Sequence, residues 1–302
     1  MPDSTIQLLR DLVAIDSVNP SLVPGAAGEQ AIAEAIAAAL RTAGLDVEVT
    51  EAAPGRPNVV GVLEGRAPGR SLMLCGHMDT VGVAGMTAPF DPVERDGRLY
   101  GRGAQDMKGG LAAMIGAAGQ LAARGLPAGR VVVAAVADEE HASLGADALV
   151  RRWHADAAVV TEPTDMAMAV AHKGFAWLDV SVSGTAAHGS RPLEGRDAIL
   201  RMGRVLARLE ALDRELQSRA PHPLLGTASL HASIIQGGRE LSSYPDRCAL
   251  QMERRTLPGE PGEAPRAEVD AILAALRRED PAFAGEARLT FGRPPYELPQ
   301  GH

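Results

Sequence analysis

The chain begins with apolar residues that recur three or four positions apart. These residues are Ile6, Leu9, Val13, Ile32, Ile36 and Leu40. Side chains at this spacing lie on one face of a helix, so the pattern predicts two amphipathic helices before Gly44.

Short apolar segments then alternate with helical ones. The predicted strands are residues 45–50, 59–63, 71–75, 130–137 and 157–161, and the predicted helices are residues 111–121 and 144–153. Residues 130–137 are apolar almost throughout, which is typical of a strand buried on both faces. The first half therefore predicts an α/β domain whose mostly parallel sheet is covered by helices on both sides.

The pattern changes in the second half, because residues 175–183 alternate apolar and polar side chains as a one-sided sheet does. The predicted order is strand 175–183, helix 196–217, strand 228–235, strand 247–254, helix 264–278 and strand 287–291. This βαββαβ order is ferredoxin-like. We expect domains at residues 1–172 and 173–292, followed at 293–302 by a proline-rich tail without a helix or strand.

Composition limits the class of protein. The chain of 302 residues has a formal net charge of −8 and no cluster of Lys or Arg, which argues against nucleic acid or an anionic membrane as partner. No apolar segment approaches the roughly 20 residues that span a bilayer, and residues 1–4 lack a signal-peptide pattern. Cys75 and Cys248 suggest no disulfide framework. We therefore expect a soluble cytoplasmic protein.

Acidic and histidine side chains follow the predicted strands. These residues are His77 and Asp79, Asp106 at a helix start, Asp138, Glu139 and Glu140, and Glu162. Taken alone, each loop has a simpler explanation: a hydrogen-bonded pair for His77 and Asp79, a helix cap for Asp106, an acidic turn for residues 138–140 and a plain turn for Glu162. Successive strand ends of a parallel sheet meet at one edge, however, and together these groups favour a site for Zn²⁺, Mn²⁺ or Co²⁺.

Two details refine this metal-site hypothesis. Asp79 is placed to orient the ring of His77, and adjacent glutamates point in different directions, so that one can bind metal while the other acts as a base. The chain has neither a Gly-x-x-x-x-Gly-Lys phosphate loop nor a Gly-x-Ser-x-Gly elbow. Nucleotide binding and serine hydrolysis are therefore disfavoured.

The motifs resemble those of the co-catalytic zinc hydrolases that include acetylornithine deacetylase, succinyl-diaminopimelate desuccinylase, carboxypeptidase G and aminoacylase. The resemblance covers nearly the whole chain and is carried by residues 76–81, 101–110, 138–140, 161–164, 172–174, 184–192 and 255–260. It implies a zinc-peptidase-like catalytic domain with an inserted ferredoxin-like lid that forms a homodimer.

The resemblance also implies a site that holds two divalent metal ions, Zn²⁺ or alternatively Co²⁺ or Mn²⁺. Asp106 would bridge the two metals. His77 and Glu162 would complete one metal site, and Glu140 would bind the other metal. Glu139 would be the general base, which takes a proton from the attacking water and delivers it to the leaving amine.

Three further roles follow from the same resemblance. Asp79 would hold His77 from behind, and Arg255 would bind the substrate carboxylate. His188, in the lid, would reach the partner subunit's active site and stabilise the oxyanion.

The chain departs from the family pattern at two places. Ser243 stands where many relatives carry an asparagine that contacts substrate. In the family the chain returns from the lid to the catalytic domain, where a further histidine binds the second metal. His302 follows the lid too soon to be that ligand, so we expect residues 293–302 to begin this return and the chain to be C-terminally incomplete.

The expected function is metal-dependent hydrolysis of the amide bond of an N-acyl amino acid, as in acetylornithine deacetylase or succinyl-diaminopimelate desuccinylase. One alternative is a metallo-exopeptidase, either a carboxypeptidase or a dipeptidase, because short peptides need the same site with a different side-chain pocket. The other is a non-catalytic, dimerising protein with a vestigial metal site.

Overall fold

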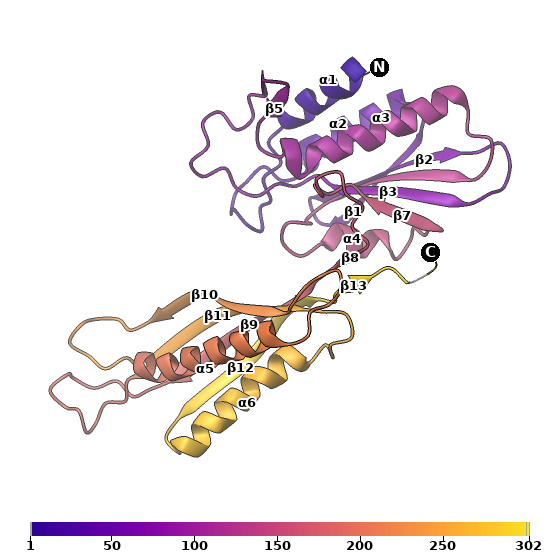
Figure 1. Ribbon diagram of the computed structural model, residues 1–302. Helices are drawn as coiled ribbons and strands as arrows, with labels where there is room; N and C mark the ends of the chain where they lie inside the picture. The colour runs from indigo at the N-terminus through magenta and orange to yellow at the C-terminus, as the bar shows by residue number, and fades with distance from the viewer. Residues whose placement is uncertain (1, 300, 302) are drawn as a thin grey trace. The chain divides into compact units, whose positions relative to one another are not determined.

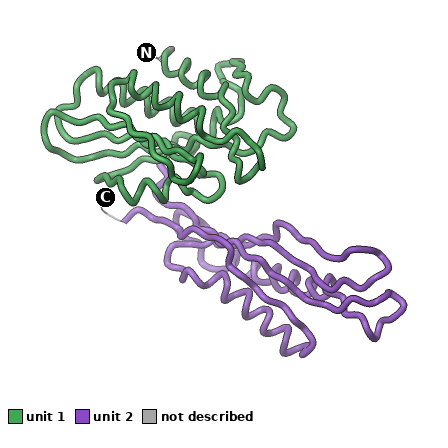
Figure 2. The backbone as a smooth tube through the Cα atoms, turned by 180° about the vertical axis from the view of Figure 1, so that it is seen from behind, with its two compact units in different colours: residues 1–167 green, residues 168–302 purple. Residues whose placement is uncertain are grey.

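The computed structural model describes residues 2–299 and 301 and divides into two compact units. The first unit ends at Ala167 and the second begins at Met168 (Figure 2). This division precedes the expected boundary between residues 172 and 173. Each unit has its own hydrophobic core.

A five-stranded sheet organises the first unit. Its strands are β1 (Asp46–Ala53), β2 (Arg56–Glu64), β3 (Ser71–His77), β6 (Arg130–Val136) and β7 (Ala157–Val160). They lie in the order β1-β2-β6-β3-β7. Strand β3 is parallel to β6 and β7, and only β2 runs against the other four. The predicted, mostly parallel sheet is therefore confirmed.

Helices cover both faces of this sheet (Figure 1). They are α1 (Pro2–Val13), α2 (Gln30–Thr42) and α3 (Gly109–Arg124) on one face and α4 (Leu144–Leu149) on the other. Alternate residues of β6 enter the two cores: Val131 and Val133 pack with α2 and α3, while Val132 and Ala134 pack with Leu149. The uninterrupted apolar sequence of β6 follows from this burial on both faces.

The loop between β3 and α3 holds structure that the apolar pattern did not predict. A hairpin of β4 (Val93–Arg95) and β5 (Arg98–Tyr100) turns at Asp96 and Gly97, both with positive φ. Asp-Gly favours this tight turn, but the three-residue strands are too short to show an alternating pattern. A π-helical turn, η1 (Ala104–Lys108), leads into α3.

The second unit has the predicted ferredoxin-like order. Its elements are β9 (Gly174–Ser183), α5 (Ala198–Ser218), β10 (Ser229–Gly237), β11 (Arg247–Thr256), α6 (Ala264–Glu279) and β12 (Ala284–Arg293). The strands form an antiparallel sheet in the order β10-β11-β9-β12, with both helices on one face (Figure 1). Alternate residues of β9 enter the core beneath the helices, which explains the alternation in the sequence.

The proline-rich tail was expected to lack a strand, and this prediction was wrong. Within it, β13 (Tyr296–Glu297) pairs with β8 (Ala171–His172), and the rings of Tyr296 and His172 stack at 5.9 Å. Two residues can form a strand only because a partner segment lies beside them, which no local pattern shows. These contacts place residues 294–299 in the second unit, and His302 lies outside the described residues. None of the helices within residues 2–299 is both long enough and apolar enough for a membrane crossing.

Candidate metal centre

The ends of three parallel strands bring the predicted site residues of the first unit together. His77 is the last residue of β3 and pairs with Val136, the last residue of β6. Glu139 follows shortly after β6, and Glu162 follows β7 on the other side of β3. Their convergence is therefore a consequence of strand direction.

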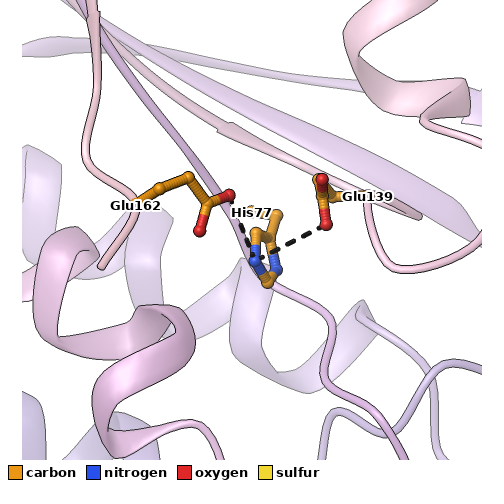
Figure 3. A group of neighbouring side chains, drawn as sticks. All are labelled: His77, Glu139 and Glu162. Carbon is orange, nitrogen blue, oxygen red and sulfur yellow. Dashed lines mark ion pairs between the residues drawn. The ribbon is translucent and has the colours of Figure 1, made fainter. Parts of the chain in front are cut away.

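Carboxylate oxygens surround the Nε2 atom of His77. Asp106 Oδ1 lies 3.0 Å away, Glu162 Oε1 3.6 Å and Glu139 Oε2 3.8 Å. Figure 3 shows the imidazole between Glu139 and Glu162. By distance, two sets of side chains are able to hold a cation: His77 with Glu139 and Glu162, and His77 with Asp106 and Glu140.

Asp106 reaches this group from the irregular turn η1, not from a helix cap. Its φ and ψ of −118° and 100° are non-helical, and the peptide bond that follows it is cis. Downstream, α3 passes close to the end of β7: a Cβ added at Gly110 would lie 2.4 Å from the carbonyl oxygen of Thr161. Gly110 is therefore required for close packing beside Glu162, not for flexibility.

Asp79 is wholly buried and has two separate contacts with the site. Its main-chain oxygen lies 2.9 Å from Nδ1 of His77, whereas its carboxylate lies 3.6 Å from the same atom. The carboxylate instead accepts hydrogen bonds from the main-chain amides of Glu139 (3.0 Å) and Glu140 (3.1 Å). Asp79 thus contacts the imidazole through its main chain and fixes the glutamate loop through its side chain.

The hydrogen bond at Nδ1 determines which atom of His77 faces the carboxylates. A carbonyl oxygen can only accept, so Nδ1 carries a proton. Without a cation Nε2 also holds a proton and donates to Asp106, and when a cation displaces that proton Nε2 presents its lone pair. The lone pair and the surrounding oxygens are all electron-pair donors, and a cation is the group that satisfies them together. One imidazole with several carboxylates is a donor set that fits Zn²⁺, Mn²⁺ or Co²⁺.

The crowding of charge shifts the ionisation of these groups. Burial would lower the pKa of His77, but its hydrogen bond to Asp106 and the nearby carboxylates raise that pKa to about 9. Burial, opposed by His77 and reinforced by the neighbouring acids, raises the pKa of Glu140 and of Glu162 to about 7. Burial also raises the pKa of Glu139. The site thus resists accumulating negative charge unless a cation neutralises it.

Accessibility is uneven across the group. The side chain of His77 is 1% exposed, whereas those of Asp106, Glu139 and Glu162 are 53%, 44% and 33% exposed. The imidazole therefore lies at the back of the group, with the carboxylates open to solvent in front.

His188 and Arg255, the other two predicted site residues, lie in the second unit. His188 is exposed in the loop after β9, where its Nδ1 lies 2.8 Å from Ser190 Oγ, and its main chain bridges to Ser243. Arg255 lies on β11 over the ring of Phe175, at 5.7 Å from the ring centre.

Four buried polar residues near the candidate metal centre were given no role in the sequence analysis: Asn19, Glu29, Arg56 and Asp138. Asp138 stood out only as part of an acidic triplet. The other three come from distant parts of the chain, and an isolated polar residue carries no local signal of such a position.

Comparison with known proteins identifies the family. The model of peptidase family M20/M25/M40 matches residues 73–292, which include every candidate site residue. The chain belongs to this family. It is therefore a hydrolase of the metal-dependent M20 type, and the resemblance inferred from the motifs is confirmed.

Two curated relatives are similar along most of the chain. Acetylornithine deacetylase of Myxococcus xanthus is 37% identical over 264 residues, which cover 83% of this chain and 68% of the relative. N-formyl-4-amino-5-aminomethyl-2-methylpyrimidine deformylase of Bacillus subtilis is 30% identical over 300 residues, which cover 92% of this chain and 69% of the relative.

Solved structures of the M20 family share the fold. A metallo-carboxypeptidase from Sulfolobus solfataricus aligns with a TM-score of 0.78 at 16% identity, covering 99% of this chain and 80% of its own. A tripeptidase from Staphylococcus aureus aligns with a TM-score of 0.75 at 22% identity, and the alignment covers 99% of this chain and 78% of the tripeptidase. At these identities the likeness shows the fold alone.

Proposed function

We propose that this M20 hydrolase removes the acyl group from an N-acyl amino acid, with acetylornithine or a related acylated amino acid as substrate. The observation that carries the proposal is the 37% identity to an acetylornithine deacetylase. The name of the deformylase relative says that it too removes a small acyl group, a formyl group. Deacylation is therefore common to the two relatives that this chain resembles in sequence.

The proposed metal ligands follow the arrangement that the resemblance implies. Asp106 would be shared by two divalent ions, His77 and Glu162 would complete the binding of one, and Glu140 would bind the other. When bound, Zn²⁺, Co²⁺ or Mn²⁺ would polarise the acyl carbonyl and lower the pKa of the attacking water. The two sets of side chains that could hold a cation by distance contain all four of these residues, which supports a metal centre here. Both sets share His77 and one includes Glu139, so the division of ligands between the two ions rests on the resemblance.

We assign proton transfer to Glu139. Its carboxylate takes a proton from the water whose oxygen attacks the acyl carbon. When the C–N bond breaks, Glu139 delivers that proton to the leaving amine, so that a carboxylic acid and a free amine are the products. The hydrogen bond from its amide to Asp79 holds the base in place, and its partial exposure leaves room for water.

We propose that His188 stabilises the oxyanion in the partner subunit of a homodimer formed through the second unit. The amide of Ser190 lies 3.3 Å from Nδ1 of His188 and can only donate. Nδ1 is therefore the acceptor, and Nε2 of the neutral ring carries the N–H that an oxyanion needs.

Arg255 is the proposed anchor for the substrate carboxylate. Its side chain is 39% exposed, and its Nη1 pairs with Glu253 at 3.4 Å, which leaves the other N–H groups of the guanidinium to face a ligand. A guanidinium presents five N–H donors in a planar fork that matches a carboxylate. We further propose that residues 1–172 form the catalytic domain and residues 173–292 the lid. We also propose that the protein works in a reducing compartment, which suits its two unpaired cysteines.

A substrate panel tests the proposal. The chain is supplied with Zn²⁺ or Co²⁺ and assayed on acetylornithine, succinyl-diaminopimelate, N-acetylmethionine and a dipeptide, with Glu139→Gln as the inactive control. Release of free amine from an acyl amino acid, absent in the control, supports a deacylase. Cleavage of the dipeptide alone would replace it with an exopeptidase, the second candidate, because a short peptide needs the same site with a different side-chain pocket.

A further inference from the structure

Five polar side chains are buried behind the candidate metal centre. They are Asn19, Glu29, Arg56, Asp79 and Asp138, of which Arg56 is 8% exposed and the others 0%. They come from the loop after α1, the start of α2, the first residue of β2 and the loops after β3 and β6. Buried polar groups are costly unless they are paired, so their partners reveal what the cluster holds.

Asn19 lies at the centre, and its orientation is unambiguous. Its Oδ1 accepts hydrogen bonds from Arg56 Nη2 (3.1 Å) and from the amide of Ser21 (2.9 Å). Its Nδ2 donates to Asp79 Oδ2 (2.7 Å) and to Asp138 Oδ1 (3.0 Å). Groups on one side can only donate, and carboxylates on the other can only accept, so a flipped amide would lose all four bonds.

Arg56 fixes the acceptor side of Asn19. Its guanidinium grips Glu29 through Nε (2.8 Å) and Nη2 (2.6 Å), and Nη2 also reaches Asp138 Oδ1 (2.9 Å). Glu29 in turn accepts from the main-chain amide of Asp138 at 3.1 Å. The planar fork of an arginine holds such a pair of carboxylates more rigidly than a lysine ammonium does.

The loop that carries the two glutamates is anchored by this cluster at consecutive residues. Asp138 adopts a left-handed conformation (φ 64°) and is held by Arg56, Asn19 and Glu29. The next two amides, of Glu139 and Glu140, donate to Asp79, whose carboxylate is itself held by Asn19. The loop therefore has few degrees of freedom left where its side chains meet His77.

We propose that Asn19, held by Arg56, is a positioning residue for the metal centre. It fixes the carboxylates of Asp79 and Asp138, and through them the main chain from which Glu139 and Glu140 reach the metals and the attacking water. This inference rests on the proposed function of those two glutamates.

Substitution of Asn19 by aspartate tests the inference with little change of shape. In Asn19→Asp, the single Nδ2 that donates to both Asp79 and Asp138 becomes a carboxylate oxygen, which repels their carboxylates. The milder Arg56→Lys keeps the charge but loses the fork. The matched control is Arg254→Lys, because Arg254 is also buried and also holds two glutamates, Glu260 and Glu268, but lies in the second unit.

The readouts are Co²⁺ affinity and the visible spectrum of bound Co²⁺, together with kcat and KM on the best panel substrate. Asn19→Asp should weaken Co²⁺ binding about 10- to 100-fold, as loss of groups that support metal ligands does, and should alter the spectrum. Arg56→Lys should change both in the same direction by less. Arg254→Lys should lower the thermal midpoint and leave the Co²⁺ affinity and spectrum unchanged; its KM is not compared, because Arg254 also donates to the main-chain oxygen of Arg255.

The outcomes separate the two hypotheses. A folded Asn19→Asp protein that keeps the affinity and spectrum of the unsubstituted chain would overturn the positioning role, and Arg56→Lys decides by the same criterion if Asn19→Asp does not fold. An unsubstituted chain that binds Co²⁺ but cleaves no panel substrate refutes the proposed function, while the spectra still decide the positioning role. Absence of any Co²⁺ binding refutes both.

Discussion

The carboxylate of Asp79 holds the main chain of Glu139, because its Oδ1 accepts the Glu139 amide at 3.0 Å. Asp79 therefore contacts the imidazole of His77 and also supports Glu139, the proposed base. Imidazole and base share one buried anchor, but the main chain of Asp79 holds the imidazole and its side chain holds the base, so a substitution at Asp79 should act first on the glutamate loop.

The proposed division of labour between adjacent glutamates predicts different losses. Glu139→Gln should keep bound metal and lose at least about 100-fold in kcat, since a general base contributes that much or more. Glu140→Gln should lose metal instead, because it removes a proposed ligand. Metal content after dialysis, measured alongside turnover, distinguishes them. If Glu139→Gln lost its metal and Glu140→Gln kept it, the two assignments would be exchanged.

The proposed sharing of His188 between subunits predicts complementation. His188→Ala and Glu139→Gln subunits, each inactive alone, should recover partial activity when mixed, because a mixed dimer contains one site with both groups intact. Turnover after mixing and re-equilibration measures this. Mixed dimers shown to form without any recovery would confine His188 to its own subunit, and a chain that is monomeric in solution would refute the proposed homodimer.

Metal affinity should rise with pH. Protons and metal compete for the same atoms: Glu140 and Glu162 hold protons below a pKa of about 7, and His77 holds one below about 9. Binding must displace these protons, so the dissociation constant for Zn²⁺ should fall as pH rises through 7 towards 9, with proton release into the medium. Competition with a metal indicator at several pH values measures this. A constant affinity over that range would contradict the assignment of these ligands.

Close packing at Gly110 predicts a cost for the smallest side chain. In Gly110→Ala the new Cβ would meet the Thr161 carbonyl at 2.4 Å, so the end of β7 must shift. We expect a loss of about 1–3 kcal/mol of stability, as overpacking costs, and weaker metal binding through the displaced Glu162. Thermal unfolding and metal titration measure the two effects.

Gly203→Ala is the control for this prediction. Gly203 lies inside α5 with no atom within 4 Å of an added Cβ, and alanine is favoured over glycine in a helix by about 1 kcal/mol. This variant should be slightly more stable than the unsubstituted chain. Equal losses in both variants would show that the contact with Thr161 does not matter.

Much of the fold was predictable because its signals are local. The apolar β6 and the alternating β9 report burial on two faces and on one face, and both patterns can be read from neighbouring residues. The hairpin β4–β5 and the pair β8–β13 were missed because their strands are only two or three residues long. Strands this short carry no periodicity.

The sequence by itself determined the order of the motifs, the fold class and the convergence of His77 with the glutamates, because parallel strands end at one edge. Asp106 joins them from the irregular turn η1, which the strand pattern did not predict. Only the tertiary structure showed that Asp79 contacts His77 through its main chain, and that Asn19 and Asp138, 119 residues apart, share a hydrogen bond. The position of a strand and the faces it buries can be read from consecutive residues. Which buried donor meets which acceptor depends on the packing of distant segments, and this leaves no periodic trace in the chain.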